Sequence, residues 1–108
     1  MLNKKKWTAI DNYDELAPGR RYPSMRASFA PQPYDGQQRI AAYLRSGEDY
    51  MASLALPHDV ITGQRIPGTT LMMHDSDYCW SSDLAYYVDH YNLRLPLKIE
   101  QDILKKAG

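Results

Sequence analysis

The chain has 108 residues, 44% hydrophobic and 24% charged, which is the size and composition of one folded domain and argues against a disordered chain. Thirteen basic residues balance thirteen acidic ones, so the chain lacks the strong positive charge of a dedicated nucleic-acid binder. The single cysteine, Cys79, excludes a disulfide within the chain.

The beginning of the chain does not have the pattern of a targeting segment. Lys4, Lys5 and Lys6 make it basic, but the apolar stretch of a secretory signal does not follow them. No run of residues approaches the roughly 18 apolar positions that a membrane-spanning helix needs. We therefore expect a soluble protein of the cytoplasm that has no membrane partner.

Residues 1–33 are predicted to be an irregular or partly ordered N-terminal segment, because prolines interrupt any helix or central strand there. Residues 16–19 are typical of a turn, and residues 25–29 are compatible with a short edge strand. Residues 34–108 are expected to form a single α+β domain.

The first predicted helix spans residues 36–46, where Ile40 and Leu44 recur at helical spacing. Asp35 and Gln38 fit a capping box at its start. Gly47 fits the left-handed residue that often ends a helix.

The period of the sequence then changes to that of β-strands. Residues 50–56, 69–74 and 78–80 predict three strands, and residues 60–66 two short arms about a turn. The apolar face of the first strand would comprise Tyr50, Ala52, Leu54 and Leu56. Connections this short favour antiparallel neighbours, so we expect a three-stranded antiparallel meander.

Two further helices are predicted after the meander. Ser81 or Ser82 can cap the first, and Asn92 fits a left-handed residue at its end. Pro96 suits the start of the second. The expected fold is therefore α+β, with the meander packed against about three short helices on one side.

The densest polar cluster spans residues 74–79 and holds an imidazole, two carboxylates and a thiol. His58 or His90 could complete a zinc site with these groups, but no known ligand spacing is present. We interpret the cluster as a turn and Cys79 as a core thiol, and predict no metal, cofactor or catalytic residue. A small metal- or thiol-dependent enzyme stays the third hypothesis.

The second hypothesis is a nucleic-acid-binding accessory protein. Arginines flank Tyr22 near the beginning of the chain, a pattern that suits phosphate contact and base stacking. The predicted contact residues are Lys4, Lys5, Lys6, Arg20, Arg21 and Arg26. A solvated, partly disordered arm is the simpler explanation of the same charges.

The first hypothesis is a non-enzymatic protein-interaction module that acts by covering the surface of another protein. Small single-domain chains rich in Tyr and without a catalytic motif are typical of inhibitors, immunity-type proteins and regulators of phages and other mobile elements, anti-CRISPR proteins among them. Met72 and Met73 must lie on opposite faces of the sheet, so one of them is exposed unless helices cover both faces. The predicted contact residues are Tyr86, Asp75, Asp77, Asp83 and Asp89, the aspartates imitating phosphate charge. A homo-oligomer is left open.

Overall fold

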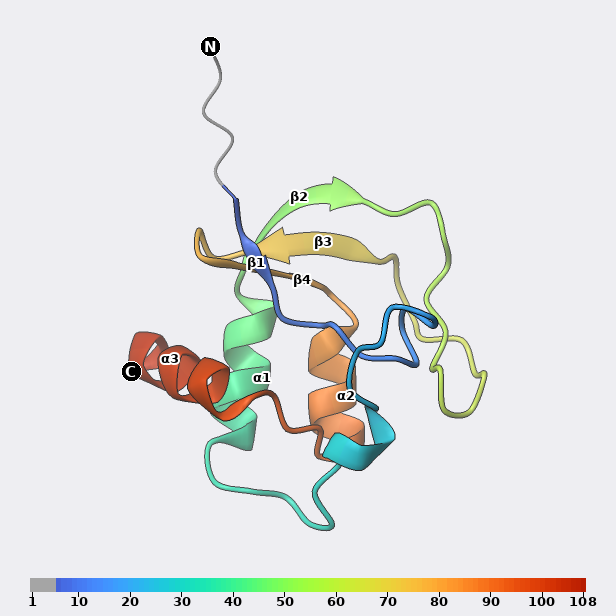
Figure 1. Cartoon of the computed structure of the whole chain (residues 1–108). Helices are drawn as coiled ribbons and strands as arrows, with labels where there is room; N and C mark the ends of the chain where they lie inside the picture. Colours follow the sequence, from blue (N-terminus) through green and yellow to red (C-terminus); the bar gives the residue numbers. More distant parts are fainter. Residues whose placement is uncertain (1–5) are drawn as a thin grey trace.

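The computed structural model describes residues 6–108, which form a four-stranded sheet with three helices on one side (Figure 1). The strands are β1 (Thr8–Ala9), β2 (Glu48–Ala52), β3 (Leu71–His74) and β4 (Tyr78–Ser81), and the helices are α1 (Gln37–Arg45), α2 (Leu84–Tyr91) and α3 (Leu97–Ala107), with a short 3-10 helix η1 (Arg26–Ser28). The predicted α+β class is confirmed. In the part of the chain that is described, no helix has the length and apolar character needed to cross a membrane.

The sheet contains the predicted meander and one strand more. Strands β2, β3 and β4 are antiparallel neighbours, and β1 lies parallel to β4 at the other edge, in the order β1-β4-β3-β2. Thr8 donates its N–H to Asp77 O, and Ile10 donates to Cys79 O. No local pattern predicts β1, because its hydrogen-bonding partner lies far along the chain.

The first strand of the meander differs from its prediction. It begins at Glu48 and ends at Ala52, and the ladder shifts register between Asp49 and Met51. This shift is a β-bulge, which breaks the alternation of faces on which the prediction depended. Leu54 and Leu56 consequently lie beyond the strand and are exposed, not buried in an apolar face.

The N-terminal segment packs into the same core as the rest of the chain. Its residues Ile10, Tyr13 and Met25 are all buried. The edge strand predicted for 25–29 is wrong: η1 takes its place, because the Glu15 carboxylate accepts the N–H groups of Met25 and the residue after it at 2.6 and 2.9 Å.

The helix ends follow the predictions in part. α1 lies within the predicted range, but Gly36 at φ 84° occupies its N-cap instead of Asp35. The side chain of Gln37, not Gln38, reaches back to accept the Tyr34 N–H at 2.9 Å. Asn92 ends α2 in the predicted left-handed conformation, at φ 55°.

Candidate functional site

Within residues 6–108, no helix or strand covers the face of the sheet opposite the helices. In Figure 1 all three helices lie below the strands. Met73 and Trp80 are cross-strand partners on the helical side and are buried. Side chains alternate along a strand, so Met72 and His74 point the other way. We call the side chains on this side the outer face; they are Trp7, Tyr50, Met51, Met72, His74 and Cys79.

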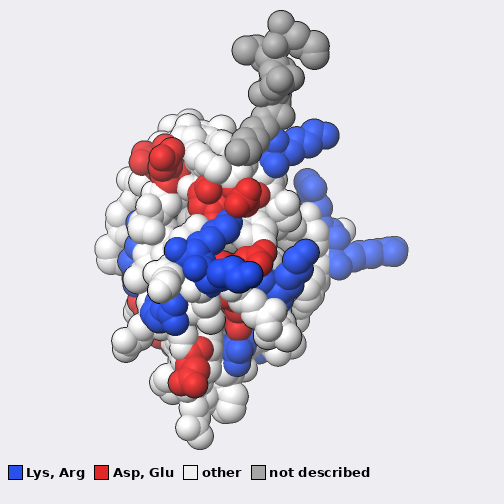
Figure 2. All heavy atoms as spheres, turned by 90° about the vertical axis from the view of Figure 1, so that its left-hand side faces the viewer, with Lys and Arg blue, Asp and Glu red and all other residues white. Residues whose placement is uncertain are grey.

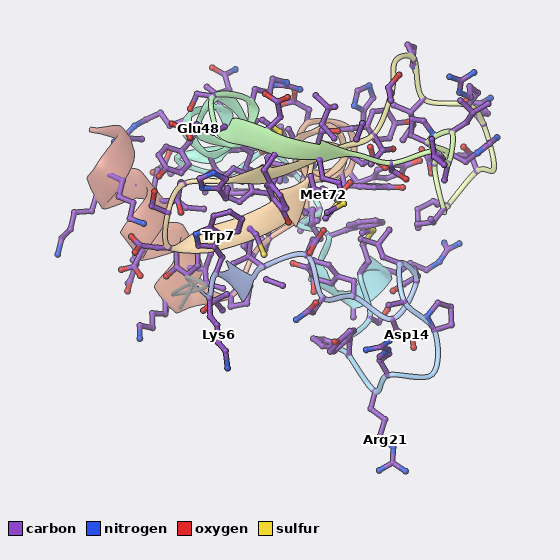
Figure 3. The ribbon with its side chains drawn as sticks, turned by 90° about the horizontal axis from the view of Figure 1, so that it is seen from above. Lys6, Trp7, Asp14, Arg21, Glu48 and Met72 are labelled. Atoms are coloured by element: carbon purple, nitrogen blue, oxygen red, sulfur yellow. The ribbon has the colours of Figure 1, made fainter. Side chains whose placement is uncertain are left out.

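Three aromatic rings form the centre of the outer face. The ring of Trp7 stacks on His74, with centroids 3.9 Å apart and planes 7° from parallel, and the Tyr50 ring meets Trp7 edge-on at 4.8 Å. Each ring comes from a different segment: Trp7 precedes β1, Tyr50 belongs to β2 and His74 to β3. Figure 3, which looks onto the sheet from above, shows Trp7 and Met72 over the strands.

The ring of His74 is oriented by two neighbours. Its Nδ1 accepts the Ser76 N–H at 3.0 Å, so in the neutral ring the proton resides on Nε2. Nε2 lies 3.6 Å from Oε2 of Glu48, whose side chain is exposed. The indole Nε1 of Trp7 is covered and has no hydrogen-bond partner among residues 6–108. These contacts fix the orientation of the His74 ring in the stack.

Cys79 lies on the outer face, half-buried, and not in the core as predicted. Its Sγ is 4.0 Å from the carbonyl oxygen of Trp7. Burial, and then the negative charge of Asp11, raise the pKa of the thiol above its usual value. A raised pKa is the opposite of what an activated nucleophile requires.

The polar cluster at 74–79 forms the predicted turn. Oδ1 of Asp75 accepts the N–H groups of Asp77 and Tyr78 at 2.9 and 2.7 Å, and its Oδ2 accepts the Tyr43 hydroxyl at 2.5 Å. Lys106 from α3 binds both Asp75 and Asp77, at 3.1 and 2.7 Å. Figure 2 shows blue and red side chains intermixed on the side of the molecule that carries α3. The two carboxylates therefore lie together, and the single positive charge of Lys106 compensates one of their two negative charges.

The other predicted contact residues lie elsewhere. Asp83 is at the opposite end of β4 from Asp77, half-buried, with its Oδ1 3.4 Å from the Thr70 hydroxyl. Asp89 on α2 forms an ion pair with Arg45 of α1. Tyr86 is half-buried, and its hydroxyl donates to Asp59 at 2.6 Å. The structure thus does not gather the acidic residues into one surface.

The basic residues of the second hypothesis lie on the outside of the N-terminal segment. Lys4 and Lys5 are outside the described residues, whereas Lys6, Arg20, Arg21 and Arg26 are exposed. Within residues 6–108 none of these four belongs to an ion pair. Figure 3 shows Lys6 and Arg21 projecting from the same side of the molecule.

A metal site needs several His, Cys, Asp or Glu side chains that converge on one point. Across residues 6–108, no three His, Cys, Asp or Glu side chains are placed to hold a metal ion. A hollow of about 210 Å³ is lined by Glu48, His74 and Asp75, but Asp75 is bound by the turn and His74 by Ser76 and Trp7. The two side chains of this hollow that could act as ligands or bases are therefore already held by other contacts.

Comparisons with protein-family models, with curated proteins and with solved structures found no match for this chain.

Sequence reasoning identified part of the outer face. The adjacent residues Met72 and Met73 predict that one methionine lies on each side of the sheet, because side chains alternate along a strand. The aromatic stack was missed, because Trp7 reaches His74 only through the pairing of β1 with β4. Asp59 was also missed as the residue that binds the tyrosines of α2.

Proposed function

We propose that this chain is a non-enzymatic protein-interaction module, of the inhibitor, immunity or regulatory type, and that its outer face is the contact surface. One observation carries the proposal: three helices cover one side of the sheet, while no helix or strand of residues 6–108 covers the other side, which carries stacked aromatic rings and methionines. A contiguous apolar surface of this kind is costly in water and typically marks an interaction site.

The chemistry of the outer face suits a protein partner. Aromatic residues and Met are enriched where proteins meet, and the stack of Trp7 on His74 holds large rings in place before binding, which lowers the entropic cost of association. Met51 and Met72 are cross-strand neighbours with flexible, polarisable side chains that adapt to a partner's shape. Glu48 gives the apolar area a charged border.

Affinity capture from the native host tests this function with two variants. Met72→Lys places a charge in the middle of the outer face, and we expect it to reduce capture of the partner at least tenfold. Leu97→Lys is the control, because it introduces the same charge at an apolar residue of α3, 66% exposed, that does not belong to the outer face. Both variants should keep the melting temperature of the wild type. Equal capture by the wild type and Met72→Lys, or loss of capture in Leu97→Lys alone, contradicts the proposal.

The acidic turn is a second part of the proposed contact. Asp77 lies at the end of the sheet beside the outer face. Its side chain is exposed and forms an ion pair with Lys106. If the aspartates imitate phosphate, Asp77→Asn weakens capture and the weakening disappears at high salt, because exposed charges are screened. A salt-independent response in this variant counts against mimicry.

Nucleic-acid binding is the second candidate function, favoured by the exposed cations of the N-terminal segment that have no carboxylate partner in the described structure. A gel-shift titration with single- and double-stranded DNA and RNA at low and moderate salt tests it. Binding that weakens with salt and with Arg20→Ala/Arg21→Ala supports this function. Absence of any shift at low salt excludes it.

A further inference from the structure

Strand β2 forms an open edge of the sheet. It is the last strand in the order β1-β4-β3-β2, and all five of its residues are exposed. Among residues 6–108, four of the six large exposed hydrophobic residues belong to β2 or to the segment that follows it; they are Tyr50, Met51, Leu54 and Leu56. An unpaired edge beside exposed apolar residues is a template for pairing with another strand.

The hydrogen bonds of β3 show which backbone groups of β2 are free. Leu71 O accepts the Ser82 N–H at 2.8 Å, and Asp75 donates its N–H to Tyr78 O at 3.1 Å. The backbone N–H and C=O groups of Leu71 and Asp75 therefore point toward β4. Met73 lies between these two residues, and its backbone groups point toward β4 as well, because alternate residues of a strand bond to the same neighbouring strand. Asp49, the partner of Met73 in β2, therefore directs its own N–H and C=O to the open edge.

On the other side of the bulge, Ala52 also directs its backbone N–H and C=O to the open edge. Ser53 donates its N–H to Thr70 O at 2.9 Å and thus faces β3. Ala52 precedes Ser53, so its N–H and C=O point to the open edge. Asp49 and Ala52 are consequently the residues of β2 whose N–H and C=O both point to the open edge, and they are three residues apart. In a regular strand such residues are two apart.

A second copy of β2 has the same three-residue spacing and matches it in the antiparallel direction. We propose that β2 pairs with β2 of a second copy about a two-fold axis between Tyr50 and Met51, which sets Asp49 of each copy opposite Ala52 of the other. The two sheets become one sheet of eight strands. An ordinary strand of another protein does not match this spacing.

The side chains are compatible with this register. Asp49 faces Ala52 and Glu48 faces Ser53, so the acidic start of each β2 meets no like charge. Tyr50 faces Met51, a pair that gives a sulfur–aromatic contact. The two outer faces come to lie next to each other on the same side of the joined sheet, and each stays open.

This dimer goes beyond the proposed function and does not depend on it. Met72 lies on β3 within the outer face, whereas Ala52 lies at the open edge. Met72→Lys should therefore abolish partner capture and leave the dimer intact, and Ala52→Pro should have the converse effect. Either idea can fail without the other.

Sedimentation equilibrium over micromolar to millimolar concentrations is the first test, with the 12.4 kDa monomer as reference. Ala52→Pro removes the free N–H but no bond to β3, and proline is tolerated on an edge strand. We expect its dimer dissociation constant to rise by roughly 10- to 30-fold, from the loss of one hydrogen bond in each copy. Ala52→Val, which keeps the N–H, is the control. A wild type that stays monomeric, or an unchanged constant in Ala52→Pro, overturns the proposal.

Disulfide trapping tests the register itself. In a Cys79→Ala background, Asp49→Cys mixed with Ala52→Cys should cross-link between copies, since facing residues of a hydrogen-bonded antiparallel pair have Cα atoms about 5.5 Å apart. Asp49→Cys alone should not, because two residues 49 do not face each other in this register. Equal cross-linking in both samples refutes the register.

Discussion

The Asp59 carboxylate and the Tyr86 hydroxyl lie 2.6 Å apart, and this hydrogen bond joins the long β2–β3 loop to helix α2. The same oxygen of Asp59 accepts the Tyr91 hydroxyl at 2.5 Å, and its other oxygen accepts the Ile61 N–H at 2.7 Å. Asp59 is only 1% exposed. Burial alone would raise the pKa of Asp59, but the hydrogen bonds from Tyr86, Tyr91 and the backbone outweigh it and lower the pKa.

Asp59→Asn is therefore expected to destabilise the fold. The amide nitrogen that replaces one carboxylate oxygen cannot accept hydrogen bonds from the two tyrosine hydroxyls. The buried hydrogen-bond network also loses the negative charge of the carboxylate. We expect the free energy of unfolding in urea at pH 7 to fall by about 2–3 kcal/mol. Tyr91→Phe, which removes one of the hydroxyls, should cost less than Asp59→Asn. A larger loss in Tyr91→Phe than in Asp59→Asn contradicts this account of the loop.

The pH dependence of stability follows from Glu15 and Asp75. Burial would raise the pKa of each, but backbone N–H groups bound to Glu15, and Tyr43 with backbone N–H groups bound to Asp75, lower both pKa values to about 2. Carboxyls of the unfolded chain titrate near pH 4. The stability that these groups add is thus fully present above about pH 5 and is lost as the pH falls toward 2.

Urea unfolding between pH 7 and pH 2 measures this loss. Glu15→Gln and Asp75→Asn should each be less stable than the wild type at pH 7 and should lose less stability on acidification. Asp14→Asn is a control for Glu15→Gln, since Asp14 is the exposed acidic neighbour of Glu15. Identical slopes in the wild type and Asp75→Asn would show that this carboxylate does not carry the effect.

The sequence predicts most of the fold because its signals are local. The helical spacing of Ile40 and Leu44 and the left-handed Asn92 each depend on a few neighbouring residues, and the structure confirms both elements. The strand predicted at 50–56 fails after Ala52 because the bulge and the docking of the next loop through Asp59 are decided by tertiary contacts. The same holds for β1, which forms only when β4 is in place.

The candidate site is less predictable than the fold. Alternation places one of Met72 and Met73 on each face of the sheet, and the structure shows that Met73 is the buried one. Turn chemistry explains Asp75. Nothing in the local sequence brings Trp7 onto His74, since Trp7 precedes β1 and His74 belongs to β3, two strands that are separated in the sheet by β4. The hydrogen bond of the predicted contact residue Tyr86 to Asp59 is not predictable for the same reason: Asp59 belongs to a loop whose position is not encoded nearby.

Gly47 is required by a close approach and not by its backbone angle. A Cβ at this position would lie 2.6 Å from Cζ2 of Trp80. Trp80 is 1% exposed and its Nε1 donates to Leu44 O at 3.1 Å, so the ring has no room to move. Gly47→Ala should therefore lower the free energy of unfolding by about 1–3 kcal/mol. In a Trp80→Phe background the added cost should shrink, and a double-mutant cycle with purely additive losses contradicts the steric explanation.

The reactivity of Cys79 decides between a contact surface and a thiol enzyme. Burial and the charge of Asp11 raise the pKa of the thiol, so at pH 7.5 the folded protein holds less of the reactive thiolate than the unfolded chain does. We expect alkylation by iodoacetamide to be at least tenfold slower in the native protein than in urea. Asp11→Asn removes the negative charge, lowers the pKa and should speed the native reaction, whereas Asp14→Asn should not. Alkylation of the native protein at a rate equal to or above that of the unfolded chain would identify an activated thiol and favour the enzyme hypothesis. Burial without an activating base can only slow the alkylation of a cysteine.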